Sequence, residues 1–141
     1  MGNVIEIPPI QETVPMEEKY LRVAAYCRVS TDQEEQDSSI ELQKLRYRQM
    51  IEENQNWENA GVFSERATGL NLQERSAFQA MMHQCREEKI DLILTKSISR
   101  FGRNTLDILR VLQELQELDV DVFFEKEDLW LHERDLQIVL T

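Results

Sequence analysis

Several features that define other classes of protein are scarce in this sequence. Its two cysteines, Cys27 and Cys85, are too few for a disulfide framework and have no metal-ligand spacing around them. No apolar stretch approaches the roughly 20 residues that a membrane-spanning helix needs. Residues 1–20 have neither a basic start nor an apolar centre, so they do not resemble a secretory signal. We therefore expect a cytosolic domain that needs no metal and no cofactor.

Positive charge is also in short supply. The chain has 16 Lys and Arg against 27 Asp and Glu, which gives a net charge of −11. Most of the excess lies at the C-terminal end, where residues 104–141 hold 3 basic and 10 acidic side chains. Proteins that hold nucleic acid tightly usually present a basic surface. If this domain acts on DNA, we expect another segment to supply the affinity.

The remaining composition is that of one globular domain. The chain has 141 residues and is 41% hydrophobic, which is enough for a single buried core. Residues 1–19 hold all three prolines and show little periodicity, so we expect a flexible leader there. The folded domain is then predicted to span residues 20–141.

Apolar runs and helical stripes alternate along that domain. Strands are predicted at 21–29, 60–64, 91–95 and 120–124, and helices at 38–54, 75–88 and 106–118. This alternation predicts an α/β fold with a mostly parallel central sheet of four or more strands, flanked by helices. The polar loops at 31–38 and 65–73 are expected to be more mobile than the strands.

The carboxyl ends of parallel strands meet at one edge of a sheet, where ligands usually bind. This rule brings Arg28 and Ser30, after the first strand, close to Arg100 and Arg103, after the third. The planar guanidinium group matches the oxygens of a phosphate. A serine hydroxyl can attack such a phosphate and form a covalent phosphoserine. From spacing alone, the sequence predicts an edge that handles phosphate.

Two motifs at this edge resemble those of a known family. The segment YCRVSTD at 26–32 is similar to the first-strand signature of the resolvase–invertase family of serine recombinases. The segment SRFGRN at 99–104 is similar to the second signature of that family, and FEKE at 124–127 resembles the segment after its fourth strand. The resemblance covers about residues 21–130, nearly the whole domain.

The resemblance implies a resolvase-like catalytic domain that cuts and rejoins DNA at specific sites. Ser30 would attack a DNA phosphate to give a 5′-phosphoserine and a free 3′-hydroxyl, followed by strand exchange and religation without ATP or metal. Arg28, Arg100 and Arg103 would hold the phosphate and stabilise the transition state. The family pattern adds four substrate-binding positions: Gln43, Thr68, Arg75 and Arg86, where Arg86 replaces the usual lysine.

The resemblance also implies partners and a setting. The DNA partner would be an attachment or recombination site, and the protein would form a homodimer that becomes a tetramer in the active complex. Ser99 stands where small resolvases and invertases have aspartate, and it matches the large serine recombinases of conjugative transposons and phages. Family members continue into a long dimer helix and DNA-binding domains, which we expect to lie outside this chain.

Other interpretations remain open on the sequence. The domain could be a non-catalytic dimerisation or regulatory module of the same fold, although its serine and arginines are intact. A phosphatase or phosphotransferase acting on a small substrate is a second alternative. A phosphatase loop at Cys27 would need an arginine at position 33, which is Gln33, so we interpret Cys27 as a buried strand residue. Neither His83 nor His132 lies in a signature, and the general base is left unassigned.

Overall fold

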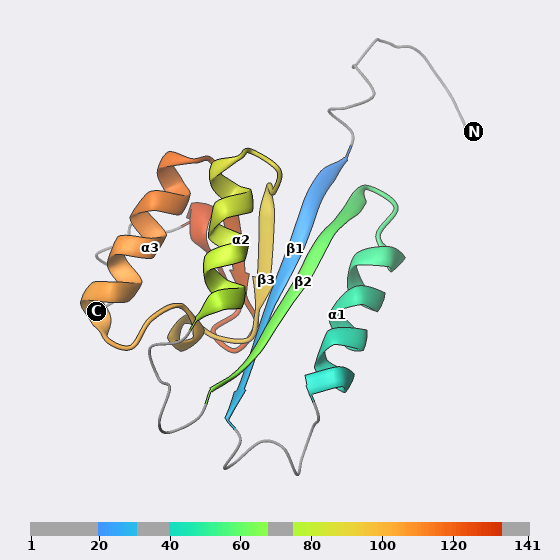
Figure 1. The fold of residues 1–141 in the computed structure, drawn as a ribbon. Coiled ribbons are helices and arrows are strands. Elements are labelled where there is room, and N and C mark those ends of the chain that lie inside the picture. Colours follow the sequence, from blue (N-terminus) through green and yellow to red (C-terminus); the bar gives the residue numbers. More distant parts are fainter. Residues whose placement is uncertain (1–19, 31–39, 68–74, 134–141) are drawn as a thin grey trace, which may run out of the picture.

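A computed structural model describes residues 20–30, 40–67 and 75–133, and these form the expected α/β fold (Figure 1). The sheet has the strand order β2-β1-β3-β4-β5. Strands β1 (Leu21–Ser30), β2 (Trp57–Ala67), β3 (Leu92–Thr95) and β4 (Asp121–Phe124) are parallel, and β5 (Leu129–Trp130) is antiparallel to β4. The prediction of a mostly parallel sheet of four or more strands is confirmed.

Helices cover both faces of this sheet. Helix α1 (Ile40–Glu53) packs on one face, and α2 (Ser76–Arg86) and α3 (Thr105–Glu117) pack on the other (Figure 1). Two short 3₁₀ turns follow β3 and β5, namely η2 (Ile98–Phe101) and η3 (Leu131–Glu133). None of the helices in the described part of the chain is long and apolar enough to cross a membrane.

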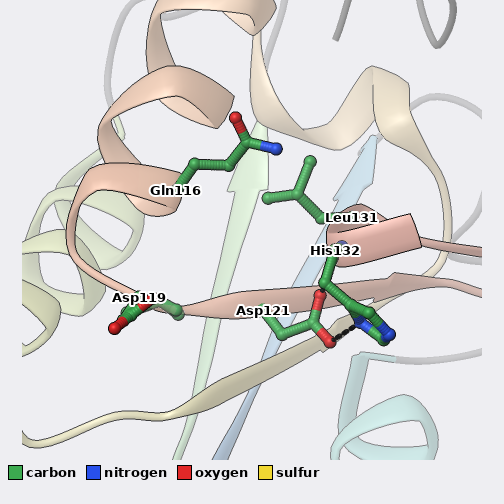
Figure 2. Close-up of a pocket in the computed structure, with 6 residues that line it drawn as sticks. Gln116, Asp119, Asp121, Leu131 and His132 are labelled. Carbon is green, nitrogen blue, oxygen red and sulfur yellow. Dashed lines mark hydrogen bonds and ion pairs between the residues drawn. The ribbon is translucent and has the colours of Figure 1, made fainter. Parts of the chain in front are cut away.

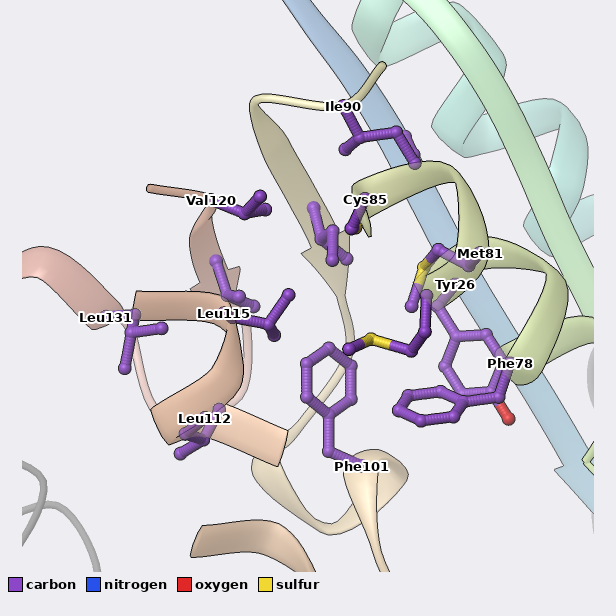
Figure 3. Close-up of a cluster of buried hydrophobic side chains, with 14 of the residues drawn as sticks. Tyr26, Phe78, Met81, Cys85, Ile90, Phe101, Leu112, Leu115, Val120 and Leu131 are labelled. Atoms are coloured by element: carbon purple, nitrogen blue, oxygen red, sulfur yellow. The ribbon is translucent and has the colours of Figure 1, made fainter. Parts of the chain in front are cut away.

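The core has two layers, one on each side of the sheet. Successive residues of a strand face opposite sides, so β1 sends Tyr26 into one layer and Cys27 into the other. The larger layer is built around Phe101, whose ring makes an edge contact with Phe78 at 5.4 Å between centroids (Figure 3). Phe101 makes a similar contact with Phe124 at 5.5 Å. All of β3 is buried, as expected for a strand covered on both faces.

The second strand differs most from its prediction. The sequence predicted a short strand at 60–64 and a polar loop from residue 65, whereas β2 runs from Trp57 to Ala67. The shorter prediction was wrong because β2 is at the edge of the sheet, where polar side chains are tolerated, and its length follows from pairing with β1. A register shift opposite Val23 and Ala24 coincides with Gly61, whose φ of 125° suits glycine.

Several predictions fall outside the described residues. They are the flexible leader at 1–19, the loop at 31–38, most of the loop at 65–73, and Thr68. These stay predictions.

Candidate active site

The carboxyl ends of β1, β2, β3 and β4 lie together at one end of the sheet, the lower end in Figure 1, and we call this end the carboxyl edge. Tyr26 pairs with Thr95, the last residue of β3, so β1 continues past its neighbour. The extension carries Arg28 opposite Glu65 and ends with Ser30 opposite Ala67. The serine and its neighbouring arginine therefore lie on a protruding end of β1, beside the loop that follows β3.

That loop, residues 96–104, carries the other two arginines of the predicted site, and we call it the arginine loop. Its centre is the 3₁₀ turn η2, in which the Arg100 amide donates to the Ser97 carbonyl at 3.1 Å. The next residue, Phe101, has no exposed surface and anchors the loop in the core. Arg100 is thus held next to a fixed point.

The second half of the loop is packed against the start of α3. A Cβ on Gly102 would be 2.8 Å from the Asp107 Cβ and 2.8 Å from the Ile108 amide nitrogen, so only glycine fits. The Asn104 side chain accepts a hydrogen bond from the Asp107 amide at 2.9 Å and caps α3. Arg103 lies between these two fixed residues and is exposed.

Arg75, one of the predicted binding residues, contacts the arginine loop directly. Its guanidinium donates to the carbonyl of Arg100 at 2.9 Å and to that of Phe101 at 3.3 Å. The same group lies 3.8 Å from the centre of the Phe78 ring, a cation–π contact. In this structure Arg75 therefore holds the backbone that carries Arg100.

Glu65 is a site residue that the sequence did not reveal. Its carboxylate accepts hydrogen bonds from the Tyr26 hydroxyl and, at 3.0 Å, from the Ala77 amide in the first turn of α2. Burial, together with the bond to Glu65, raises the pKa of Tyr26. Glu65 thus joins β1, β2 and α2 beside Arg28. No sequence signal pairs residues this far apart, although a tyrosine in a buried strand requires some partner.

Some arginines of the domain pair with other protein groups, and others are available to bind a ligand. Three form ion pairs with carboxylates from distant segments: Arg22 with Asp91 at 2.9 Å, Arg46 with Glu125 at 2.6 Å, and Arg86 with Glu114 at 2.6 Å. Arg28 and Arg103 make no hydrogen bond or ion pair with any described residue. Cations that are held at one edge without a protein partner can accept the oxygens of a phosphate.

Comparison with known proteins agrees with this interpretation of the carboxyl edge. The family model described as "Resolvase, N terminal domain" matches residues 23–140. The chain belongs to the resolvase family. It is 25% identical over 104 residues to a resolvase/recombinase from Pseudomonas putida, a match that covers 74% of this chain and 51% of that protein. The chain thus spans about half the length of this curated relative.

Solved structures show the same fold. A resolvase family site-specific recombinase from Streptococcus pneumoniae is 29% identical, with a TM-score of 0.68, and the match covers 85% of this chain and 83% of that one. The N-terminal catalytic domain of TP901-1 integrase is 20% identical, with a TM-score of 0.65, covering 84% and 88% of the two chains. At that identity the second likeness concerns the fold alone.

Two of the predicted binding residues of this resolvase-family domain lie in different places. Gln43, on α1, lines a pocket of about 260 Å³ with Arg46, Lys96 and Glu125 at the carboxyl edge. Arg86 is in the last turn of α2, which runs opposite to the strands and ends at the far edge, where Arg86 pairs with Glu114. The structure brings Gln43 to the site and does not bring Arg86 there.

A second pocket, of about 290 Å³, lies away from the arginine loop, at the start of β4 (Figure 2). His132 and Asp121 are among its polar lining residues, with the His132 Nδ1 2.5 Å from an Asp121 carboxylate oxygen. Neither residue is near the arginine loop, so this histidine does not serve Ser30. Across the described ranges, no group of three or more His, Cys, Asp or Glu residues could hold a metal ion.

Proposed function

We propose that this domain is the catalytic part of a serine site-specific recombinase, with Ser30 as the nucleophile. The observation that carries the proposal is the carboxyl edge of the sheet. There β1 ends at Ser30, and Arg28 and Arg103 have no partner among the described residues. Fixed cations stabilise the negative charge that develops on a phosphate under attack, most strongly where water is excluded.

In the proposed reaction, the phosphorus exchanges its ester bond to the DNA for an ester bond to Ser30. The Ser30 Oγ forms a bond to phosphorus and its proton leaves to solvent, while the bond between phosphorus and the 3′-oxygen of the DNA breaks. The 3′-oxygen takes up a proton, and the 5′ end stays joined to Ser30. Attack by a 3′-hydroxyl on the phosphoserine reverses the step and reseals the strand. The phosphoserine conserves the bond energy, so neither ATP nor a metal has a required role.

The proposed partners follow from this chemistry and from the resemblance to the family. Exchange between two sites requires each strand to be cut and rejoined, so we propose recombination sites on DNA as the substrate. We propose a homodimer that assembles into a tetramer on two sites, acting in a bacterial cytoplasm as part of a mobile element. Gln43 and Arg75 belong to the proposed site, Thr68 is kept as a proposal, and Arg86 is left out because of its position.

The experiment is to trap the covalent intermediate. The full-length protein first selects its site from a library of random duplexes, and a copy of that site with a nick beside the cleavage point then serves as the suicide substrate. We expect a protein–DNA adduct with the wild type and none with Ser30→Ala, although Ser30→Ala should bind the site almost unchanged. An adduct formed by Ser30→Ala would refute the assignment. Binding without any wild-type adduct would favour the regulatory module instead.

A further inference from the structure

The turn between β4 and β5, residues 125–128, joins α1 to the rest of the carboxyl edge. The Glu125 carboxylate accepts two hydrogen bonds from Arg46, at 2.6 and 3.4 Å, and one from the Tyr47 hydroxyl at 2.7 Å. Only 19% of the Glu125 side chain is exposed. This carboxylate therefore fastens the turn to α1.

The backbone of the same turn holds the first half of the arginine loop. The Glu125 amide donates to the Thr95 carbonyl at 3.0 Å, and the Lys126 amide donates to the Lys96 carbonyl at 2.7 Å. The Glu127 carboxylate accepts from the Ile98 amide at 3.2 Å. The turn thus supports the residues immediately before Arg100, while Arg75 supports the carbonyl of Arg100 itself.

Several charges at this edge act on the core layer under α1. Burial raises the pKa of the Cys27 thiol to about 11, and the positive charges of Lys44, Arg100 and Arg46 act in the opposite direction. Cys27 belongs to the core layer under α1. Arg100 is therefore close enough to this layer for its charge to act there, alongside Arg46 and Glu125.

We propose that Glu125 is a positioning residue for Arg100. Its carboxylate locks the turn 125–128 against α1, and the turn sets the backbone from which the Arg100 side chain extends. This inference rests on the proposed function, in which Arg100 holds the scissile phosphate. Catalytic groups that are misplaced by about 1 Å can cost as much as a hundredfold in rate, so a loosened turn would affect chemistry before it affected binding.

Glu125→Gln tests the proposal, because it removes the charge and keeps the shape. We expect the maximal rate of adduct formation on the nicked site to fall by about tenfold to a hundredfold, with an unchanged half-saturating DNA concentration. Tyr47→Phe, which removes one of the three hydrogen bonds to this carboxylate, should give a smaller loss in the same direction. Urea unfolding of each variant confirms that it is folded under the conditions of the rate measurement.

Glu114→Gln is the matched control. It breaks a similar bidentate pair with an arginine, at 2.6 and 3.0 Å, at the other edge of the sheet, and should leave the rate of adduct formation unchanged. A double-mutant cycle then asks through which residue Glu125 acts. In an Arg100→Ala background, Glu125→Gln should cost little further rate.

Four results would overturn the positioning role of Glu125, and one of them would also overturn the proposed function. A wild-type rate with Glu125→Gln, the same loss with Glu114→Gln, or additive losses with Arg100→Ala would each overturn the positioning role alone. Absence of any adduct with the wild-type protein would overturn the proposed function and this inference together.

Discussion

At the residue scale, arginine has two different uses in this domain. Arg22 and Arg46 each pair with a carboxylate on another element, and Arg75 pairs with backbone carbonyls. These contacts engage the terminal nitrogens of Arg46 and Arg75 within the protein, whereas the buried Nε of Arg75 has no hydrogen-bond partner among the described residues. Arg28 and Arg103 have no such contacts among the described residues. Residue type and spacing in the sequence do not distinguish the two groups, because the partners come from distant segments.

The arginines without a partner among the described residues should not tolerate substitution by lysine. Arg28→Ala should lower the rate of adduct formation by roughly a hundredfold, equivalent to about 3 kcal/mol, because one cation that meets the developing charge is lost. Arg28→Lys should recover little of this rate, since an ammonium group cannot reproduce the planar fork. Arg22→Lys, at the opposite edge, should leave the rate unchanged. A wild-type rate for Arg28→Lys would show that Arg28 does not contact the phosphate.

The two cysteines should be chemically inert in the folded domain. Only 2% of Cys27 and 1% of Cys85 is exposed, which confirms the interpretation of Cys27 as a buried strand residue. Burial raises the pKa of Cys27 to about 11 and that of Cys85 to about 12. Since the thiolate is the reactive form, iodoacetamide should label neither residue appreciably at pH 8, and both should react quickly in urea.

The same shifts have a consequence for stability. A folded-state pKa above the ordinary thiol value of 9.0 means that the unfolded chain loses its thiol protons first. The thiols therefore contribute fully to stability below about pH 9, and this contribution falls as the pH rises toward 11. Native labelling of Cys27 at pH 8 as fast as in urea would contradict both the burial and the shift.

At the scale of elements, the sequence predicted best those segments whose own pattern determines them. The apolar runs of β1 and β3 and the capped helix α3 agree with their predictions to within one or two residues. Strand β5 was missed because Leu129 and Trp130 are too few to form a pattern. Its position follows from pairing with β4 and from the Trp130 ring, 4.8 Å from that of Phe123.

The site was predictable to the same extent. Its edge and its arginines follow from the order of strands and from two local motifs. The roles of Glu65 and Glu125 do not, because each acts through partners far along the chain, namely Tyr26 and Arg46. Contacts of this kind depend on the packing of α1 and α2 on the sheet, which no local pattern encodes.

Gly102 provides a test of how firmly the arginine loop is packed on α3. Gly102→Ala places a Cβ against the Ile108 amide nitrogen and the Asp107 Cβ, and neither can move without shifting the helix. We expect a loss of about 1–3 kcal/mol in the free energy of unfolding, together with a large loss of adduct formation, as Arg100 and Arg103 move apart. Asn104→Ala removes only the helix cap, and should cost about 1 kcal/mol. Unfolding in urea and the trapping assay measure the two effects, and an unaltered rate for Gly102→Ala would contradict this packing.

At the scale of the whole molecule, charge is distributed between the two edges of the sheet. Basic residues lie at or just beyond the carboxyl ends of the strands, including Arg28, Arg66, Lys96, Arg100 and Arg103. Acidic residues gather at the opposite edge, where the helices end, including Glu52, Glu53, Glu87, Glu88, Glu117 and Asp119. A net charge of −11 thus coexists with a basic edge that faces the proposed substrate. If DNA is the substrate as proposed, we expect this charge distribution to orient it toward the arginines and to give little affinity.

Residues 1–141 alone should therefore bind duplex DNA weakly and without sequence preference. Dissociation constants of non-specific complexes are typically about 1–100 µM at physiological salt, and the acidic edge places this domain at the weak end of that range. Lowering the salt should strengthen binding, because the counterions that DNA releases when it binds protein gain more entropy in a dilute salt solution. Fluorescence anisotropy of a labelled duplex over a range of salt concentrations measures both effects.

Arg28→Ala combined with Arg103→Ala should weaken this binding more than Arg22→Ala combined with Lys89→Ala, which removes the same charge from the opposite edge. Sub-micromolar, site-specific binding at physiological salt would show instead that the domain recognises its recombination site by itself.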